Sequence, residues 1–113
     1  MLRSLKTNQR KERILSLEVD GTGTAAINIG SKLATLVDNG TGDYSLTFTR
    51  AFARQPIASA TPLTDVTQCR IKAISTTVIN IECTNADATT PTDCDFHLIV
   101  IGWDTADEYG DDT

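Results

Sequence analysis

The sequence of 113 residues has few aromatic side chains and no long hydrophobic run. No segment approaches the run of about 18 apolar residues that a membrane-spanning helix requires. The basic residues at the amino terminus are not followed by the apolar stretch of a signal peptide. We therefore expect neither export nor a membrane partner.

Cysteine and histidine are also scarce, which limits metal chemistry. The three cysteines, Cys69, Cys83 and Cys94, are an odd number in a chain for which export is not expected, so they are predicted to be small, reduced core residues. A zinc site would have to add His97, and structural zinc usually uses closely spaced cysteine pairs. Cys94 and His97 are three residues apart, and on a strand such residues point to opposite faces. Core packing is favoured, and no metal or cofactor is expected.

His97 is the only histidine, so a Ser–His–Asp or Cys–His mechanism would have to use it. Its neighbours on the same face of a strand are Asp95 and Ile99, and the sequence contains no G-x-S-x-G nucleophile motif. A surface or interface histidine is the simpler interpretation. We expect a protein that is not an enzyme, with a small hydrolase as the rival hypothesis.

Each end of the chain is dominated by charge of one sign. Residues 1–13 contain five basic residues and one acidic residue, while residues 14–113 carry a net charge of −9. Such a basic arm and acidic tail (105–113) favour contacts with partners or between subunits. The acidic body argues against nucleic acid as the main partner, because phosphate binding needs a positive surface. The tail also lacks the ligand spacing of a calcium-binding loop.

Two interpretations of the basic arm remain open. It is either a flexible, solubilising terminus or an anchor that binds an acidic surface through its charge and through Leu2 and Leu5. The anchor is favoured.

Threonine is abundant, with 18 residues, and most of these lie in or beside short runs of Val, Ile and Leu. Threonine is β-branched and fits a pleated surface, so this bias favours strands. The clearest segment is 44–49, where Tyr44, Leu46 and Phe48 alternate with Ser and Thr. Short alternating segments separated by turn residues predict an all-β fold, an antiparallel β-sandwich or small barrel of seven or eight strands. The expected strands are 14–19, 25–29, 33–37, 44–49, 57–61, 69–73, 79–83 and 94–103, within a sandwich domain of residues 14–104.

The expected final strand, 94–103, is apolar on both faces. One face carries Cys94, Phe96, Leu98 and Val100, and the other becomes apolar from Ile99 onward, through Ile101 to Trp103. A strand that is apolar on both faces is usually covered on both faces. The second cover is expected to be a neighbouring subunit, or else a loop or the basic arm folding over it.

Residues 21–26 (GTGTAA) match the G-x-G-x-x-A pattern of a dinucleotide-binding turn, with Asp38 downstream. That site would need a helix over residues 25–33, a segment with Gly30 and little helix propensity. Further strand–helix repeats are also missing. A glycine turn between two strands is the favoured interpretation.

Three segments carry a family resemblance. They are 42–48 (GDYSLTF), 52–56 (FARQP) and 93–104 (DCDFHLIVIGWD). Their order and spacing resemble a β-module that recurs in virion proteins of tailed bacteriophages, over about residues 39–109. The resemblance implies a compact β-sandwich, often trimeric, on the phage head or on tail appendages. It identifies no catalytic residues.

Related modules often end long fibre proteins, whereas this chain has only a short basic arm. The expected function is therefore that of a head decoration (cement) protein, made in the host cytoplasm and bound to the major capsid protein on the outer surface of the virion. The alternative is a receptor- or carbohydrate-binding tip of a tail fibre, for which Tyr44, Trp103 and Tyr109 are the available aromatic residues. The candidate interface residues are Leu2, Arg3, Leu5, Lys6, Arg10, Lys11 and Arg13 in the arm and Ile99, Ile101 and Trp103 in the final strand.

Overall fold

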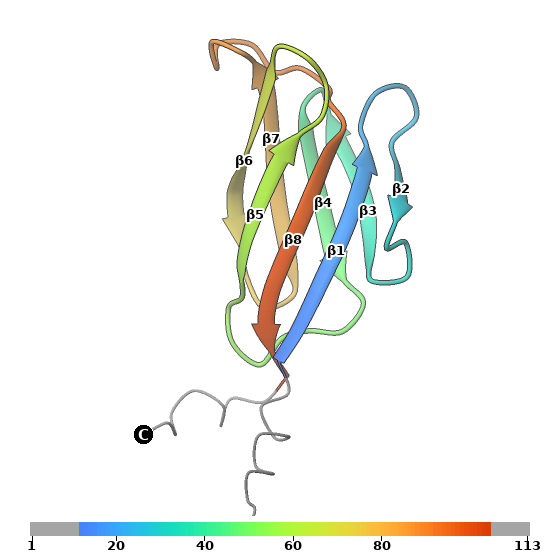
Figure 1. Ribbon diagram of the computed structural model, residues 1–113, viewed down its shortest axis with the longest axis vertical. Coiled ribbons are helices and arrows are strands. Elements are labelled where there is room, and N and C mark those ends of the chain that lie inside the picture. The colour runs from blue at the N-terminus through green and yellow to red at the C-terminus, as the bar shows by residue number, and fades with distance from the viewer. Residues whose placement is uncertain (1–11, 105–113) are drawn as a thin grey trace, which may run out of the picture.

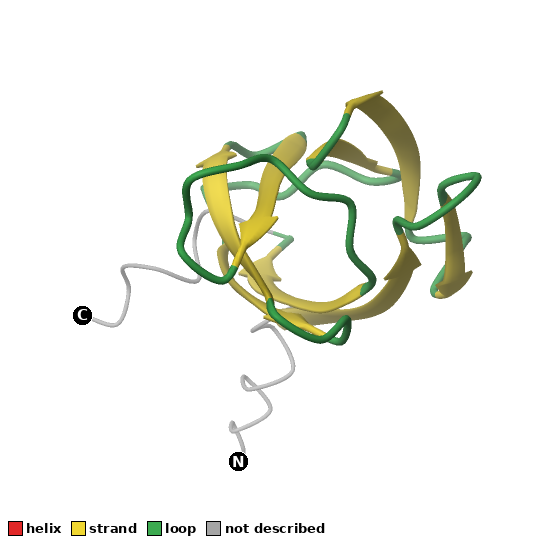
Figure 2. Ribbon diagram, turned by 90° about the horizontal axis from the view of Figure 1, so that it is seen from above, coloured by secondary structure: helices red, strands yellow, loops and turns green. Residues whose placement is uncertain are grey.

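The structure, a computed structural model, describes residues 12–104, which form two four-stranded sheets packed face to face (Figures 1 and 2). All strand pairs are antiparallel, and this part of the chain contains no helix that could cross a membrane. Sheet I has the order β2 (Ala26–Ile29), β1 (Glu12–Asp20), β8 (Phe96–Trp103) and β5 (Ile57–Pro62). Sheet II has the order β3 (Ala34–Gly40), β4 (Asp43–Phe48), β7 (Val78–Asn85) and β6 (Thr67–Ile74).

The predicted all-β sandwich is confirmed, with small shifts at strand ends. β1 begins at Glu12, so Glu12 and Arg13 belong to the sandwich and not to the arm, and β8 begins at Phe96 and not at Cys94. The remaining arm residues and the tail, 105–113, lie outside the described residues. These include six candidate interface residues: Leu2, Arg3, Leu5, Lys6, Arg10 and Lys11.

The core forms because β1, β4, β7 and β8 alternate between buried side chains and more exposed ones. Tyr44, Leu46 and Phe48 are buried as predicted, and a side chain of this size contributes roughly 1.5–3 kcal/mol when fully buried. β1 and β8 of sheet I and β7 of sheet II supply the same pattern. These inward residues are Leu15, Leu17, Val19, Ile79, Ile81, Cys83, Phe96, Leu98 and Val100.

A hydrogen-bonded cluster around Tyr44 closes the upper end of the sandwich. The Tyr44 hydroxyl lies 2.9 Å from both the Gly21 carbonyl oxygen and Asp93 Oδ1, and donates its proton to these acceptors. Asp93 also accepts a hydrogen bond from the Gly42 N–H at 2.8 Å. Gly42 has a φ of +68°, and a Cβ there would lie 2.3 Å from the Cys83 carbonyl oxygen, so glycine is required.

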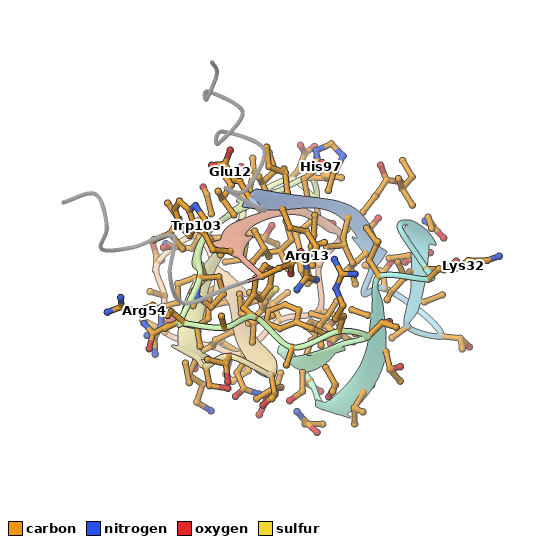
Figure 3. All side chains as sticks on the ribbon, turned by 90° about the horizontal axis from the view of Figure 1, so that it is seen from below. Glu12, Arg13, Lys32, Arg54, His97 and Trp103 are labelled. Carbon is orange, nitrogen blue, oxygen red and sulfur yellow. The ribbon has the colours of Figure 1, made fainter. Side chains whose placement is uncertain are left out.

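Arg13 closes the lower end, which Figure 3 views from below. Its guanidinium carbon lies 4.0 Å from the centre of the Phe52 ring, and its Nε donates to Asp104 Oδ1 at 2.8 Å. The same side chain donates to the carbonyl oxygens of Arg50 and Ala51. Arg13 therefore ties the start of β1 to the loop after β4 and to the end of β8.

Replacing Tyr44 by Phe should lower the free energy of unfolding at pH 7 by about 1–3 kcal/mol, because Asp93 and the Gly21 carbonyl lose a buried donor. Burial and the hydrogen bond to Asp93 raise the pKa of Tyr44 above its usual 10.0. A raised pKa stabilises the fold fully below pH 10 and progressively less above it.

Urea unfolding of wild type and Tyr44→Phe between pH 7 and 11 measures both effects. Thr47→Val, on the outer face of the same strand, is the matched control and should change stability by less than about 0.5 kcal/mol. Equal stability of wild type and Tyr44→Phe at pH 7 would contradict the role of this hydroxyl.

Candidate interaction surface

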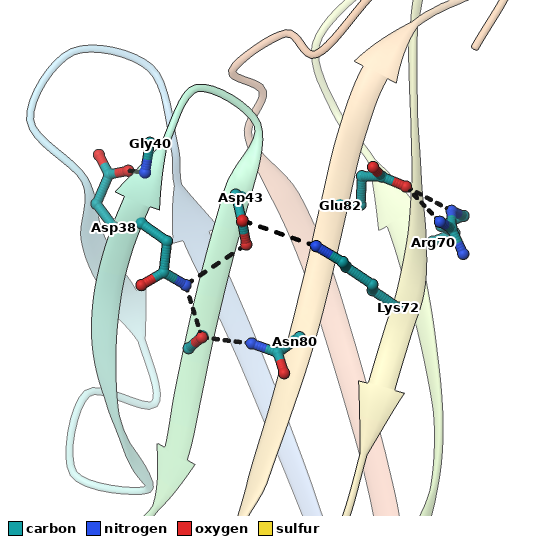
Figure 4. A network of polar contacts seen from close by, with 9 residues as sticks. Asp38, Gly40, Asp43, Arg70, Lys72, Asn80 and Glu82 are labelled. Atoms are coloured by element: carbon teal, nitrogen blue, oxygen red, sulfur yellow. Dashed lines mark hydrogen bonds and ion pairs between the residues drawn. The ribbon is translucent and has the colours of Figure 1, made fainter. Parts of the chain in front are cut away.

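The outer faces of the two sheets differ in polarity. On sheet II, Asn39 and Asn80 both donate to the Ser45 hydroxyl, and Lys72 Nζ lies 3.8 Å from Asp43 (Figure 4). Next to them Arg70 pairs with Glu82 at 2.6 Å. These polar side chains satisfy one another and are exposed or half-buried, and Val37, opposite Ser45, is the large apolar side chain that this face exposes. The face is therefore mainly polar and suited to water.

Sheet I carries an apolar outer face instead. Ile14 of β1, Ile101 of β8 and Ile57 of β5 are direct neighbours in the strand register and form one row across three strands, called here the isoleucine row. Ile14 is 58% exposed and Ile57 is 64% exposed, while Ile101 between them is half-buried. A row of three β-branched apolar side chains facing outward is unfavourable in water and typical of a contact surface.

The next row, called here the serine row, has Ile99 flanked by Ser16 and Ser59. Ile99 is 48% exposed, and the two serines are exposed as well. Together the isoleucine and serine rows make up the centre of the sheet I face, defined here as the outward side chains of β1, β8 and β5.

Polar residues bound this face at both ends. Glu12 lies opposite Trp103 at the lower end (Figure 3). Glu18, His97 and Thr61 form a row at the upper end. His97 Nε2 lies 3.0 Å from Glu18 Oε1. An apolar centre between polar ends is the usual composition of a protein–protein interface.

A hollow of about 200 Å³ lies beside Ile99, where β2 meets β1. The register of these two strands shifts at Glu18/Val19, and Ile29, which is 55% exposed, lies across the hollow from Ile99. The other lining residues are Ser16, Leu17, Glu18, His97 and Leu98. Most of the lining is apolar, so the hollow suits a hydrophobic side chain of a partner.

The structure separates the sequence-predicted interface residues into two groups. Ile99, Ile101 and Trp103 do share the outer face of β8, and Ile99 stays exposed with respect to residues 12–104. A covering loop was one expected alternative, and no loop within the described residues covers Ile14, Ile57 or Ile99. Arg13 belongs to the other group, because its guanidinium is engaged at the lower end of the sandwich, with the side chain only 14% exposed.

Sequence reasoning missed Ile14 and Ile57. Ile14 directly precedes the inward-facing Leu15, so the start of β1 has an apolar side chain on each face of the sheet. In β5 the inward positions hold the small residues Ala58 and Ala60, and this hid the outward direction of Ile57. The adjacent apolar pair Ile14–Leu15 was the available signal.

The structure also describes the residues of two other candidate sites, the dinucleotide-binding turn and the zinc set. Residues 21–25 form the turn between β1 and β2, and Ala26–Ile29 is a strand, so the helix that a dinucleotide site needs is missing. Cys94 is fully buried and His97 is exposed, on opposite sides of sheet I. Among residues 12–104 no group of three or more Cys, His, Asp or Glu is arranged to hold a metal ion.

The three cysteines are free thiols at the upper end of the core. Cys69 and Cys83 lie opposite each other on β6 and β7, and Cys83 and Cys94 are fully buried. The neighbouring thiols and burial raise the pKa of Cys83, which keeps this thiol protonated. These residues act as small apolar side chains, as predicted.

The residues that carry the family resemblance have structural roles. Asp95 Oδ1 accepts hydrogen bonds from the N–H groups of Gly21 and Thr22, at 3.0 and 3.3 Å. Gly102 packs against Phe52 and Pro56, because a Cβ at Gly102 would lie 2.5 Å from the Phe52 ring. Comparisons with protein-family models, curated proteins and solved structures found no match to this chain.

Asp95→Asn should lower stability at pH 7 by about 1–2 kcal/mol, because the backbone donors of Gly21 and Thr22 lose a charged acceptor. Burial alone would raise the pKa of Asp95, but hydrogen bonds with Asp20 and from Thr22 and Gly21 lower it below 3.8. A lowered pKa stabilises the fold above pH 3.8, and this contribution disappears as the pH falls through the lowered value. The difference between wild type and variant should therefore shrink in acid.

Urea unfolding between pH 2 and 7 tests this expectation. Asp65→Asn, in an exposed loop, is the matched control and should match wild type throughout. A difference between wild type and Asp95→Asn that stays constant down to pH 2 would show that the carboxylate charge is not involved.

Proposed function

We propose that this chain is a structural protein of a tailed-phage virion, a decoration (cement) protein that binds and stabilises the major capsid shell. The observation that carries the proposal is the contrast between the two outer faces. Sheet II presents a mainly polar network of paired side chains, while the sheet I face presents Ile14 and Ile57 with more than half of their surface exposed and Ile99 with 48% exposed. Such a face needs a protein partner, and a binding protein is its natural context.

The order of the pattern residues supports the virion assignment. The GDY segment, the F-x-x-x-P segment and the final strand are brought together at the two ends of one sandwich. A fold closed in this way is a compact module suited to an exposed position on a particle. Proposed assembly partners are the capsid protein and further copies of this chain, with a trimer as the state that the resemblance implies.

Attachment to the shell is assigned to the basic arm. Residues 1–11 carry four basic residues and no acidic residue, while the rest of the chain has a net charge of −9. Opposite charge on the capsid surface would attract the arm and keep the acidic body outward. Preferential binding to the expanded shell would then stabilise that shell by mass action.

A chain that begins at Glu12 should keep its fold but bind expanded capsids at least tenfold more weakly than the full chain. The measurement uses shells purified from a phage mutant that lacks this protein, with unexpanded shells for comparison. Circular dichroism and thermal unfolding of the truncated chain provide the control for folding.

Capsid binding by the full chain should weaken as salt rises, because charge supplies the attraction. Equal occupancy by the full and truncated chains would refute the anchor role. Failure of the full chain to bind any shell, together with specific binding to a glycan array, would replace decoration by the tail-tip alternative.

A further inference from the structure

The two central rows of the sheet I face have complementary shapes. The isoleucine row has three large side chains, Ile14, Ile101 and Ile57, whereas the serine row has a large side chain only at its centre. The rows follow each other at a spacing of two residues along each strand, which is about 7 Å. The serine row therefore has a depression on each side of Ile99.

We propose that a second copy of this chain covers the sheet I face, packed face to face about a two-fold axis that runs across the strands between these two rows. Such an axis places the isoleucine row of each copy on the serine row of the other. Both copies then use the same surface, as two-fold symmetry requires. The resulting contacts are Ile14 on Ser16 of the second copy, Ile57 on Ser59, and Ile101 on Ile99 at the centre.

Large side chains thus meet small ones at four positions of the interface. Sheets that pack face to face lie about 10 Å apart with their strands within about 30° of alignment, which keeps neighbouring side chains in these pairs. A rotation about an axis along the strands would instead leave the isoleucine rows facing each other. The pattern of sizes therefore selects one arrangement.

The available area fits a reversible dimer. Three strands about 4.8 Å apart and about 26 Å long cover roughly 400 Å² per copy. A total of roughly 800 Å² lies below the area of most specific interfaces, as expected for a weak, reversible dimer. The polar ends of the face also meet in this arrangement, with Trp103 on His97 and Glu12 near Glu18 of the second copy. Because these rim carboxylates repel each other, salt should strengthen the dimer or leave it unchanged.

This inference deepens the proposed function, since it names the partner of the sheet I face, and it replaces the implied trimer by a dimer. It rests on the proposed function only for its biological setting. Self-association is measured on purified protein without capsids, whereas shell attachment is measured by truncation of the arm. The two can therefore fail separately.

Sedimentation equilibrium of the full chain over 1–500 μM should show a reversible monomer–dimer equilibrium, with a dimer of about twice 12.2 kDa. The dimer should persist or tighten when salt is raised from 50 to 500 mM. A monomer at every concentration, or a trimer, would overturn the proposal.

Ser16→Ile provides the decisive variant. It adds apolar surface, yet it should weaken the dimer at least tenfold, because Ile14 of the second copy no longer fits. The double variant Ile14→Ser/Ser16→Ile again places one large and one small side chain in each pair of positions 14 and 16 across the interface. It should return the dissociation constant to within about threefold of wild type. Ser59→Ile, alone and with Ile57→Ser, repeats the test at β5.

Thr47→Ile, which adds the same side chain to the outer face of sheet II, is the matched control and should leave self-association unchanged. Thermal unfolding identifies any variant that fails to fold, and the β5 pair then replaces the β1 pair. If Ser16→Ile associated more tightly than wild type, association would be nonspecific and driven by apolar area alone. That result would overturn the two-fold arrangement.

Discussion

In β1, β4, β7 and β8, side chains point alternately into the core and outward, and the fold itself covers only the inward ones. The inner environment is the core between the sheets, built from residues such as Leu17, Tyr44 and Leu98. The outer environment must be either water or another molecule. Sheet II has polar outward residues that suit water, and sheet I has isoleucines that do not. Sheet I therefore exposes the larger apolar surface, whereas on the outer face of sheet II the large exposed apolar side chain is Val37.

The residues that hold the sandwich together and the apolar residues exposed on its surface are different in this chain. The hydroxyl of Tyr44, the carboxylates of Asp93 and Asp95 and the close packing at Gly102 hold the ends of the sandwich together. A sequence pattern made of such residues reports architecture. The outward residues of β1 and β5, including Ile14 and Ile57, lie outside the three pattern segments, whereas those of β8 lie within one of them. The two kinds of residue therefore need separate tests.

Much of the architecture was predictable because alternation is a local signal. All eight strands, the inward set of Tyr44, Leu46 and Phe48, and the two-faced character of β8 follow from neighbours in the sequence. The isoleucine row could not be predicted in this way, because it joins Ile14, Ile57 and Ile101 through non-local strand pairing. Arg13 was assigned to the arm from its charge, but its long side chain reaches Phe52 and Asp104 in the folded chain. Charge alone does not report such a contact.

Glu12 and Trp103 are direct partners in the ladder between β1 and β8, so the described chain enters and leaves the sandwich at one point (Figure 1). A domain whose chain ends lie side by side can be inserted into a loop of another protein with little distortion. Its ends can also be joined in a circular permutant. The same closeness makes the upper end, with the turn after β1, the position farthest from both connections. A peptide fused to either end of the described chain would therefore emerge at the lower end of the sandwich. The upper end would remain free for other contacts.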